Sequence, residues 1–423
     1  MPLTAPQRAI WTAQQFEATG YGYNIAESVE IHGSLDPGLF TRVVHAVETE
    51  AQSLHIRIVA DAEGVRQIPR TPGPGLCTFL DLVDRHDARA LAEDVMRTEV
   101  ETPLELSQRS ALRNLLFRID ADVFLWFHGY HHLVADGATG GLLWERISET
   151  YSALAAGRPV PPGRARPLAR IVEEDLAYRA SEDFALDRAY WTALLAQPPA
   201  PVDLVPVADV FPVGRALRHS AELSPRVLEA LGAAARRAST SWPVAVLAAS
   251  AAHLHHISGQ DELILGLPVT GRGTPAARDT PGMFSNVLPL RLRVPARATT
   301  DELLRQTSRA VREMRAHQRY RGEDLVRDLA LRHGSDRLWG TEVNIMSFGY
   351  QGGTAGDAAP GVVRALNLGP ADRPVINVFD RRNGLPVVVQ FEADSARCDE
   401  KKLKAGLEHF MEFLERFAGG GAI

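Results

Sequence analysis

The pattern of hydrophobic and polar residues alternates between strand-like and helix-like spacing in the first half of the chain. Residues 27–32 have an extended pattern, and residues 37–52 place apolar side chains at helical spacing. Residues 112–119 and 123–130 are apolar runs separated by a short Asp-Ala-Asp turn, which predicts a pair of strands. A second helix is expected over residues 140–156.

A proline-rich stretch at residues 157–167 stops any helix and marks a boundary or linker. A charged helix is expected over residues 171–195, and the glycine-rich residues 349–361 predict a mobile loop. The other expected elements are strands at 55–59, 216–223 and 262–267 and helices at 90–101, 225–238 and 243–257. The sequence thus predicts two similar layered α/β (α+β) units, residues 1–170 and residues 171–423.

Composition excludes several classes of protein. The 423 residues fit two domains of about 200 residues each. With 45% hydrophobic and 23% charged residues the chain is typical of soluble globular proteins, and its net charge of -6 is spread out, so no nucleic-acid partner is expected. The longest apolar run, residues 244–254, is too short to span a membrane and predicts a core helix. Only Cys77 and Cys398 are present, too few for a disulfide framework, which favours a reducing, cytoplasmic setting.

The segment with candidate chemistry is WFHGYHHLVADG, residues 126–137. An apolar strand leads into His131 and His132, and Asp136-Gly137 forms a turn before the next helix. Histidine suits acyl transfer because it can accept a proton at physiological pH. A helix N-terminus nearby could stabilise the negative charge of a tetrahedral intermediate.

Structural interpretations compete with this one. Two adjacent histidines can be core residues with satisfied hydrogen bonds, and His255-His256, in an Ala-rich helix, are interpreted in that way. Asp136-Gly137 alone is an ordinary turn or helix cap. Adjacent histidines rarely converge on one metal and no HExxH spacing is present, so no metal is predicted.

The complete HHxxxDG pattern, residues 131–137, resembles the signature of condensation domains and of the wider chloramphenicol-acetyltransferase-like superfamily. Residues 258–272 are a very close match to the family's central strand and arginine turn, whereas Ser285 stands where an apolar residue is usual. The subfamily that the sequence resembles most is expected to be that of the first domain of the serine-activating enterobactin synthase component, on the basis of residues 314–320 and 343–345. Other matches, in the family's order, are at residues 4–11, 53–57, 104–113, 173–191, 282–290 and 317–328.

The resemblance implies two chloramphenicol-acetyltransferase-like lobes in a V with a central tunnel, the first lobe carrying the His motif and the second sending loops across to it. It implies that His132 is catalytic, as a general base or by positioning the amine, and that His131 is structural. By the same resemblance Asp136 would hold Arg272 in a buried ion pair.

Two further candidates follow from the resemblance. Gly137 would let backbone amides approach the reacting centre, and Asn344 would polarise the acyl oxygen. The alternative for Asn344 is an amide that merely ties down a strand. No Ser or Cys stands in a nucleophile setting such as GxSxG, so direct transfer without an acyl-enzyme is expected.

The implied function is amide (or ester) bond formation between a carrier-bound acyl thioester and an amine (or hydroxyl), in nonribosomal peptide or siderophore-like biosynthesis. The implied partners are peptidyl or aryl carrier proteins, whose phosphopantetheine arms tether the substrates, with no permanently bound cofactor, no membrane and a monomeric chain. Three alternatives stay open: a coenzyme A-dependent acyltransferase of the same superfamily, a noncatalytic recruitment platform, and an epimerase built on the same fold, although the further signature of epimerases is not visible. No adenylation or carrier signature is visible, so the chain is expected to be a stand-alone enzyme or an excised module fragment.

Overall fold

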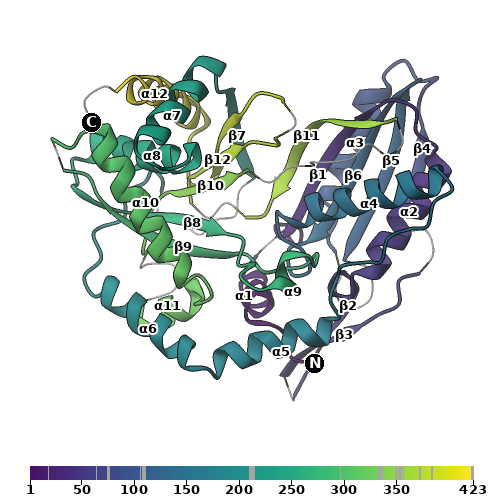
Figure 1. Cartoon of the computed structure of the whole chain (residues 1–423), viewed down its shortest axis with the longest axis horizontal. Helices are drawn as coiled ribbons and strands as arrows, with labels where there is room; N and C mark the ends of the chain where they lie inside the picture. The colour runs from purple at the N-terminus through teal and green to yellow at the C-terminus, as the bar shows by residue number, and fades with distance from the viewer. Residues whose placement is uncertain are drawn as a thin grey trace.

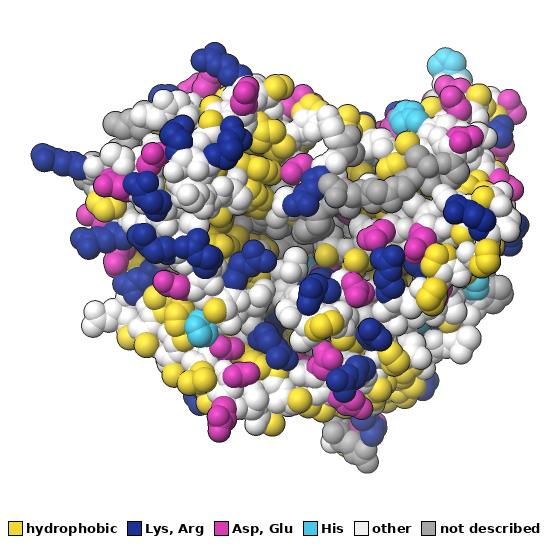
Figure 2. Space-filling model, in the orientation of Figure 1, with side chains coloured by type: hydrophobic (Ala, Val, Ile, Leu, Met, Phe, Trp, Pro, Cys, Tyr) yellow, Lys and Arg dark blue, Asp and Glu magenta, His cyan; other side chains and the backbone are white. Residues whose placement is uncertain are grey.

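The chain forms two lobes that diverge like the arms of a V in the computed structural model (Figure 1). The space-filling view shows an indentation between the lobes at the upper edge of the molecule (Figure 2). Each lobe is built on one β-sheet covered by helices. The structure describes residues 1–17, 19–62, 64–73, 77–104, 106, 111–208, 215–295, 297–331, 337–347, 350, 355, 357–370, 373–382 and 384–420.

The N-terminal lobe contains a five-stranded sheet with the order β11-β1-β6-β5-β4. Its strands are β1 (Asn24–His32), β4 (Cys77–Asp81), β5 (Leu112–Asp120), β6 (Val123–His131) and β11 (Ala359–Leu368). The other elements of this half are α1 (Ala5–Gln14), α2 (Pro37–Glu50), η1 (Gln52–Leu54), the hairpin β2 (Ile56–Asp61) and β3 (Gly64–Pro69), α3 (Ala88–Val100) and α4 (Thr139–Ala155).

Both faces of this sheet are covered, because side chains alternate along each strand. On β6, Trp126 packs in the core under α2 and α4, whereas Phe127 packs in the core under α3. The predicted strand pair is confirmed, since β5 and β6 run antiparallel around the expected turn. The strand that carries the histidines is therefore rigidly held from both sides.

The C-terminal lobe contains a six-stranded sheet with the order β7-β13-β12-β10-β8-β9. Its strands are β7 (Ala216–Glu222), β8 (Glu262–Val269), β9 (Asn286–Arg293), β10 (Glu342–Met346), β12 (Val375–Phe379) and β13 (Val388–Asp394). Its helices are α7 (Pro225–Arg237), α8 (Trp242–Ser258), α9 (Pro275–Arg278), α10 (Thr300–Ala316), α11 (Gly322–Asp328) and α12 (Glu400–Ala418). The predicted core helix is confirmed as α8, which is buried between the sheet, α7, α10 and α12.

One predicted helix is wrong in extent. The stretch expected as a single helix over residues 171–195 forms two, α5 (Leu168–Arg179) and α6 (Glu182–Leu194). The break occurs because Ser181 takes an extended conformation and caps α6, its side chain accepting a hydrogen bond from the Phe184 amide. Among the described residues, no helix is long and apolar enough to cross a membrane.

One strand crosses between the lobes. β11 follows β10 in the chain but leaves the C-terminal sheet and pairs antiparallel with β1. The chain then returns to the C-terminal sheet as β12. The loop expected at residues 349–361 lies in part outside the described residues, which lack 349, 351–354 and 356, and its last residues, 359–361, are instead the start of β11. The division at residues 170 and 171 stays a prediction.

The N-terminal core contains a carboxyl group that makes no ion pair with any described residue. Glu48, on α2, is fully buried, and both of its carboxyl oxygens lie 2.9 and 3.0 Å from Asn114 Nδ2. Burial raises the pKa of Glu48 to about 8, and the hydrogen bond from Asn114 opposes the shift. Glu48 is therefore largely neutral at pH 7 in the folded protein.

Replacing Glu48 by Gln should remove part of the pH dependence of stability. The pKa of Glu48 rises from 4.5 to about 8 on folding, so its stabilising contribution is complete below pH 4.5 and is lost as the pH approaches 8. Between about pH 4.5 and pH 8 the same histidines titrate in the parent and in the variant, so their contribution cancels in the comparison. There the free energy of unfolding of the parent should fall relative to Glu48→Gln, by at most about 1.4 kcal/mol per pH unit.

Urea denaturation in small pH steps measures this difference. Glu408→Gln, at an exposed position on α12, is the control and should keep the slope of the parent. Parallel pH profiles for the parent and Glu48→Gln would contradict the prediction.

Candidate active site

His131, the last residue of β6, and His132, which follows it, are held in opposite tautomers. His131 Nδ1 accepts a hydrogen bond from the Leu133 amide at 3.1 Å, so this nitrogen carries no proton. His132 Nδ1 lies 2.9 Å from the Ala135 carbonyl oxygen, which can only accept, so here Nδ1 carries the proton. The Nε2 atom of neutral His132 therefore keeps its lone pair, and no described residue is hydrogen-bonded to it.

The surroundings of both rings favour the neutral form. His131 is buried and stacks on Tyr23 with the ring centroids 6.4 Å apart, and burial lowers the pKa of His131 to about 3. Desolvation also lowers the pKa of His132, although the charge of Asp136 opposes it. Because His132 is partly exposed and His131 is not, His132 has the accessible lone pair.

The structure places Asp136 and Arg272 together. Asp136 Oδ1 lies 2.8 Å from Arg272 Nη2, and the exposed fractions of the two side chains are 2% and 6%. The same carboxylate accepts hydrogen bonds from the Ala138 amide at 3.1 Å and the Phe284 amide at 3.1 Å. The pair therefore joins the turn before α4 to the connection between β8 and β9 of the other lobe.

Arg272 also folds the connection to which it belongs. Its Nη1 donates to the carbonyl oxygens of Ala277 and Thr280, the latter at 2.6 Å, and its guanidinium lies 4.6 Å from the centre of the Phe284 ring. The preceding Gly271 has a φ of +63°, and a Cβ there would lie 2.1 Å from the Phe284 carbonyl oxygen. Only glycine fits this turn, and the turn aims Arg272 at Asp136.

The other two sequence candidates lie on different lobes. Gly137 is exposed in the turn between Asp136 and α4. Asn344 lies on β10, where its Nδ2 donates to Asn377 Oδ1 on β12 at 3.1 Å. The amide nitrogen has a second hydrogen that this bond does not use. The role of Asn344 as an oxyanion partner stays a prediction.

Gly369 was not predicted, and it lies against His132. It is buried at the end of β11 with a φ of +103°, and a Cβ there would lie 3.3 Å from His132 Cδ2. The His132 amide donates to the Tyr23 carbonyl oxygen at 2.7 Å, so the residue before β1 also contacts the histidine. The Gly369-Pro370 dipeptide predicts a turn from the sequence. It does not predict that the turn lies beside His132, because β11 reaches the N-terminal sheet through contacts between residues far apart in the sequence.

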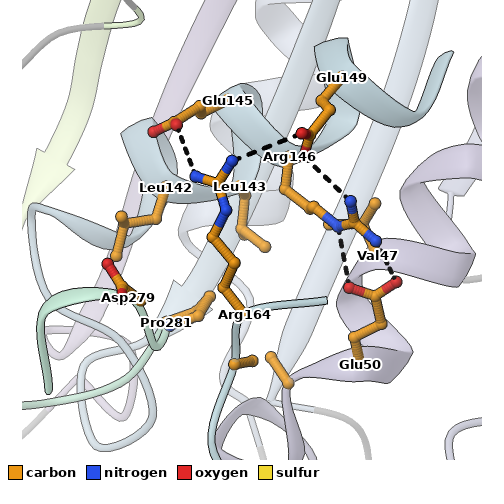
Figure 3. Close-up of a pocket in the computed structure, with 12 residues that line it drawn as sticks. Val47, Glu50, Leu142, Leu143, Glu145, Arg146, Glu149, Arg164, Asp279 and Pro281 are labelled. Carbon is orange, nitrogen blue, oxygen red and sulfur yellow. Dashed lines mark hydrogen bonds and ion pairs between the residues drawn. The ribbon is translucent and has the colours of Figure 1, made fainter. Parts of the chain in front are cut away.

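A pocket that is open to solvent lies beside α2 and α4 (Figure 3). Arg146 on its wall is bound to Glu50 at 2.9 and 3.0 Å and to Glu149 at 3.0 Å. Arg164 lies 3.0 Å from Glu145. Both arginines are paired with carboxylates, and none of the predicted site residues lines the pocket, so we assign it no chemistry.

A known protein family matches nearly the whole chain. The family is the Condensation domain, and the match covers residues 1–420. The chain belongs to the condensation domain family. Condensation domains are acyltransferases of nonribosomal peptide synthetases, so the predicted family and class of enzyme are confirmed.

Curated relatives are much longer than this chain. The dimodular nonribosomal peptide synthase of Bacillus subtilis is 34% identical over 99% of the chain and 18% of its own length. The isonitrile lipopeptide synthase of Streptomyces coeruleorubidus is 36% identical over 98% of the chain and 28% of its length. Enterobactin synthase component F of Escherichia coli is 28% identical over the whole chain and 33% of its length. The expected similarity to this protein is confirmed, but the two relatives above are more similar, so the expectation that it is the nearest subfamily is not supported.

Solved condensation domains have the same fold. The starter condensation domain of rhizomide synthetase, as a mutant in complex with C8-CoA and Leu-SNAC, matches with a TM-score of 0.91 and 30% identity, over 100% of this chain and 95% of that one. The first condensation domain of the calcium-dependent antibiotic synthetase, in complex with a substrate analogue, matches with a TM-score of 0.87 and 32% identity, over 100% and 97%. The predicted layered α/β lobes in a V are confirmed.

Replacing Asp136 by Asn should destabilise the fold as well as reduce activity. The substitution keeps the size of the side chain but removes the charge that compensates the buried Arg272. Loss of one partner of a buried pair costs about 3–5 kcal/mol, measurable as the free energy of unfolding in urea.

The control for this variant is an ion pair on the surface. Glu93→Gln removes one partner of the Arg364–Glu93 pair, whose side chains are 54% and 47% exposed, and should cost less than about 1 kcal/mol. Equal stabilities of Asp136→Asn and Glu93→Gln would show that the buried pair does not stabilise the fold.

Proposed function

We propose that this condensation domain joins a carrier-bound acyl thioester to an amine and that His132 accepts or orients the proton of the attacking amine. The observation that supports this role is the hydrogen bond of His132 Nδ1 to the Ala135 carbonyl oxygen, 2.9 Å long, which leaves the Nε2 lone pair free. A neutral imidazole with a free nitrogen can accept a proton at physiological pH.

The amine nitrogen attacks the thioester carbonyl carbon, and the carbonyl electrons move to the oxygen. His132 Nε2 accepts or orients the ammonium proton of this intermediate, whose collapse breaks the carbon–sulfur bond. The proton ends on the released pantetheine thiol, so the products are an amide and a free thiol. A hydroxyl acceptor would give an ester by the same steps.

The surrounding residues have supporting roles in this proposal. Asp136 and Arg272 hold the turn that contains Ala135, and Gly137 leaves the backbone amides of that turn accessible. Asn344 is the candidate donor to the acyl oxygen from the opposite lobe. Alignment of two tethered substrates in the predicted tunnel supplies much of the rate, because proximity can lower a barrier by about 7–11 kcal/mol in favourable cases.

Replacing His132 by Ala should abolish amide formation and leave the fold intact. His255→Ala is the matched control, since His255 Nδ1 also lies 2.9 Å from a backbone carbonyl oxygen, that of Gln260. The assay follows product by mass spectrometry, with circular dichroism and thermal melting to check both variants. Product formation by folded His132→Ala at the rate of the parent would rule out the role, and an inactive parent would favour a noncatalytic recruitment platform.

The donor in this proposal is a phosphopantetheine-bound thioester on a peptidyl or aryl carrier protein, and the domain acts as a cytoplasmic monomer with no bound cofactor. Direct transfer is supported by the state of the two cysteines. Both Cys77 and Cys398 are buried, and burial raises the pKa of each thiol, which disfavours the nucleophilic thiolate. A coenzyme A thioester is the second candidate donor, since a related structure contains C8-CoA.

Acyl-carrier protein should be used in preference to acyl-coenzyme A and acyl-N-acetylcysteamine. The measurement compares kcat/KM for the three donors carrying one acyl group, with and without a chelator. Acyl-coenzyme A as the preferred donor, inhibition by the chelator, or an acyl adduct detected on the protein by intact mass would each contradict this assignment.

A further inference from the structure

The C-terminal sheet carries a row of polar side chains on the face turned away from its helices. Asn344 Nδ2 donates to Asn377 Oδ1 at 3.1 Å, and Asn377 Nδ2 donates to Glu392 Oε2 at 3.1 Å. Glu392 Oε1 accepts from Arg218 Nε at 3.0 Å and from Arg218 Nη2 at 2.7 Å. The chain neighbours of the row on β10, β12 and β13 pack in the helix-covered core, so the row itself lies on the opposite face.

Arg218 connects this row of polar side chains to β11, the strand that crosses between the lobes. Its Nη1 donates to the Leu366 carbonyl oxygen at 2.8 Å, and its Nη2 donates to Asn367 Oδ1 at 2.9 Å. Asn367 Nδ2 in turn donates to the carbonyl oxygen of Asn24 on β1. One guanidinium thus connects the buried Glu392 to the end of β11, which its planar set of five N–H donors allows.

The end of β11 forms one side of the site. Gly369 follows Asn367 by two residues and lies in contact range of the His132 ring. Because β11 pairs with β1 and the His132 amide is bound to the residue before β1, a shift of this strand end moves the surroundings of the imidazole.

We propose that Arg218, held by Glu392, is a positioning residue that fixes the end of β11 so that Gly369 closes one side of the His132 ring. The part of this inference that is tested by activity rests on the proposed role of His132, whereas the part that is tested by the titration of His132 does not. Arg218 does not touch the reacting atoms in this proposal. It acts by keeping water out of the space beside the ring and by keeping the ring in place.

Loss of Arg218 should have two effects. The end of β11 gains freedom to move, which misplaces the ring and should lower kcat about 10–100-fold with a small change in KM. Water reaching the ring should raise the pKa of His132 towards its ordinary value, because desolvation is the main cause of its lowering. Among the described residues, the titratable groups that interact with His132 are Asp136 and His131, and the substitution alters neither side chain.

The experiment compares Arg218→Met with Arg337→Met in the full chain. Arg337 is the matched control because it belongs to the same lobe, is 26% exposed against 25% for Arg218, and binds both oxygens of Asp203 at 2.9 and 3.1 Å. Steady-state kinetics give kcat and KM, and ¹³C-labelled histidine gives the titration of His132 by NMR, assigned with His132→Ala. Arg218→Met should lower kcat and raise the titration midpoint of His132, and Arg337→Met should do neither.

A second variant covers the outcome in which Arg218→Met fails to fold. Arg218→Lys keeps a charge for Glu392 but cannot bind the strand end through a planar fork, so it should give intermediate shifts. Equal kcat and equal His132 titration in the parent and the folded Arg218 variants would overturn the inference. A raised midpoint in a protein that makes no amide would instead support the positioning role and refute the proposed function.

Discussion

The buried ion pair of Asp136 and Arg272 is the interaction on which the arrangement of the site depends. Each charge is almost fully removed from water, so neither is tolerated without the other. Its consequence extends to the histidine, because Asp136 directly follows Ala135, whose carbonyl oxygen fixes the proton of His132 on Nδ1. The pair that joins the lobes therefore also holds the turn that sets the tautomer.

The lobes meet again at β11, where the contacts are of a different kind. Arg218 binds the end of the strand, and Arg381, which follows β12, forms a buried pair with Glu27 on β1. Glu27 also accepts a hydrogen bond from Tyr350 at 2.7 Å. Arginines of the C-terminal lobe thus bind the N-terminal sheet at two places away from the turn, which limits how far the V can open without breaking buried polar contacts.

Local pattern was sufficient to predict the strands β5 and β6, the core helix α8 and the histidines at a strand end. It was insufficient for the break at Ser181, where one cap overrides a continuous helical pattern. The resemblance predicted that loops of the second lobe cross to the first. It did not predict the pairing of β11 with β1 or the bonds of Arg218, and local pattern could not, since these contacts join residues about 150 or more positions apart. Arg272 was reached through family resemblance alone, as its partner lies 136 residues away.

The same exclusion of water acts on both bases of the proposed reaction. Burial disfavours imidazolium, which keeps the Nε2 lone pair of His132 available. An amine that enters the same surroundings is subject to the same penalty, so its ammonium form is disfavoured and its nucleophilic form is favoured. A wall that excludes water, such as the one Gly369 provides beside the ring, would therefore prepare the acceptor as well as the histidine. On this argument the crossing strand contributes to the chemistry without supplying a reacting group.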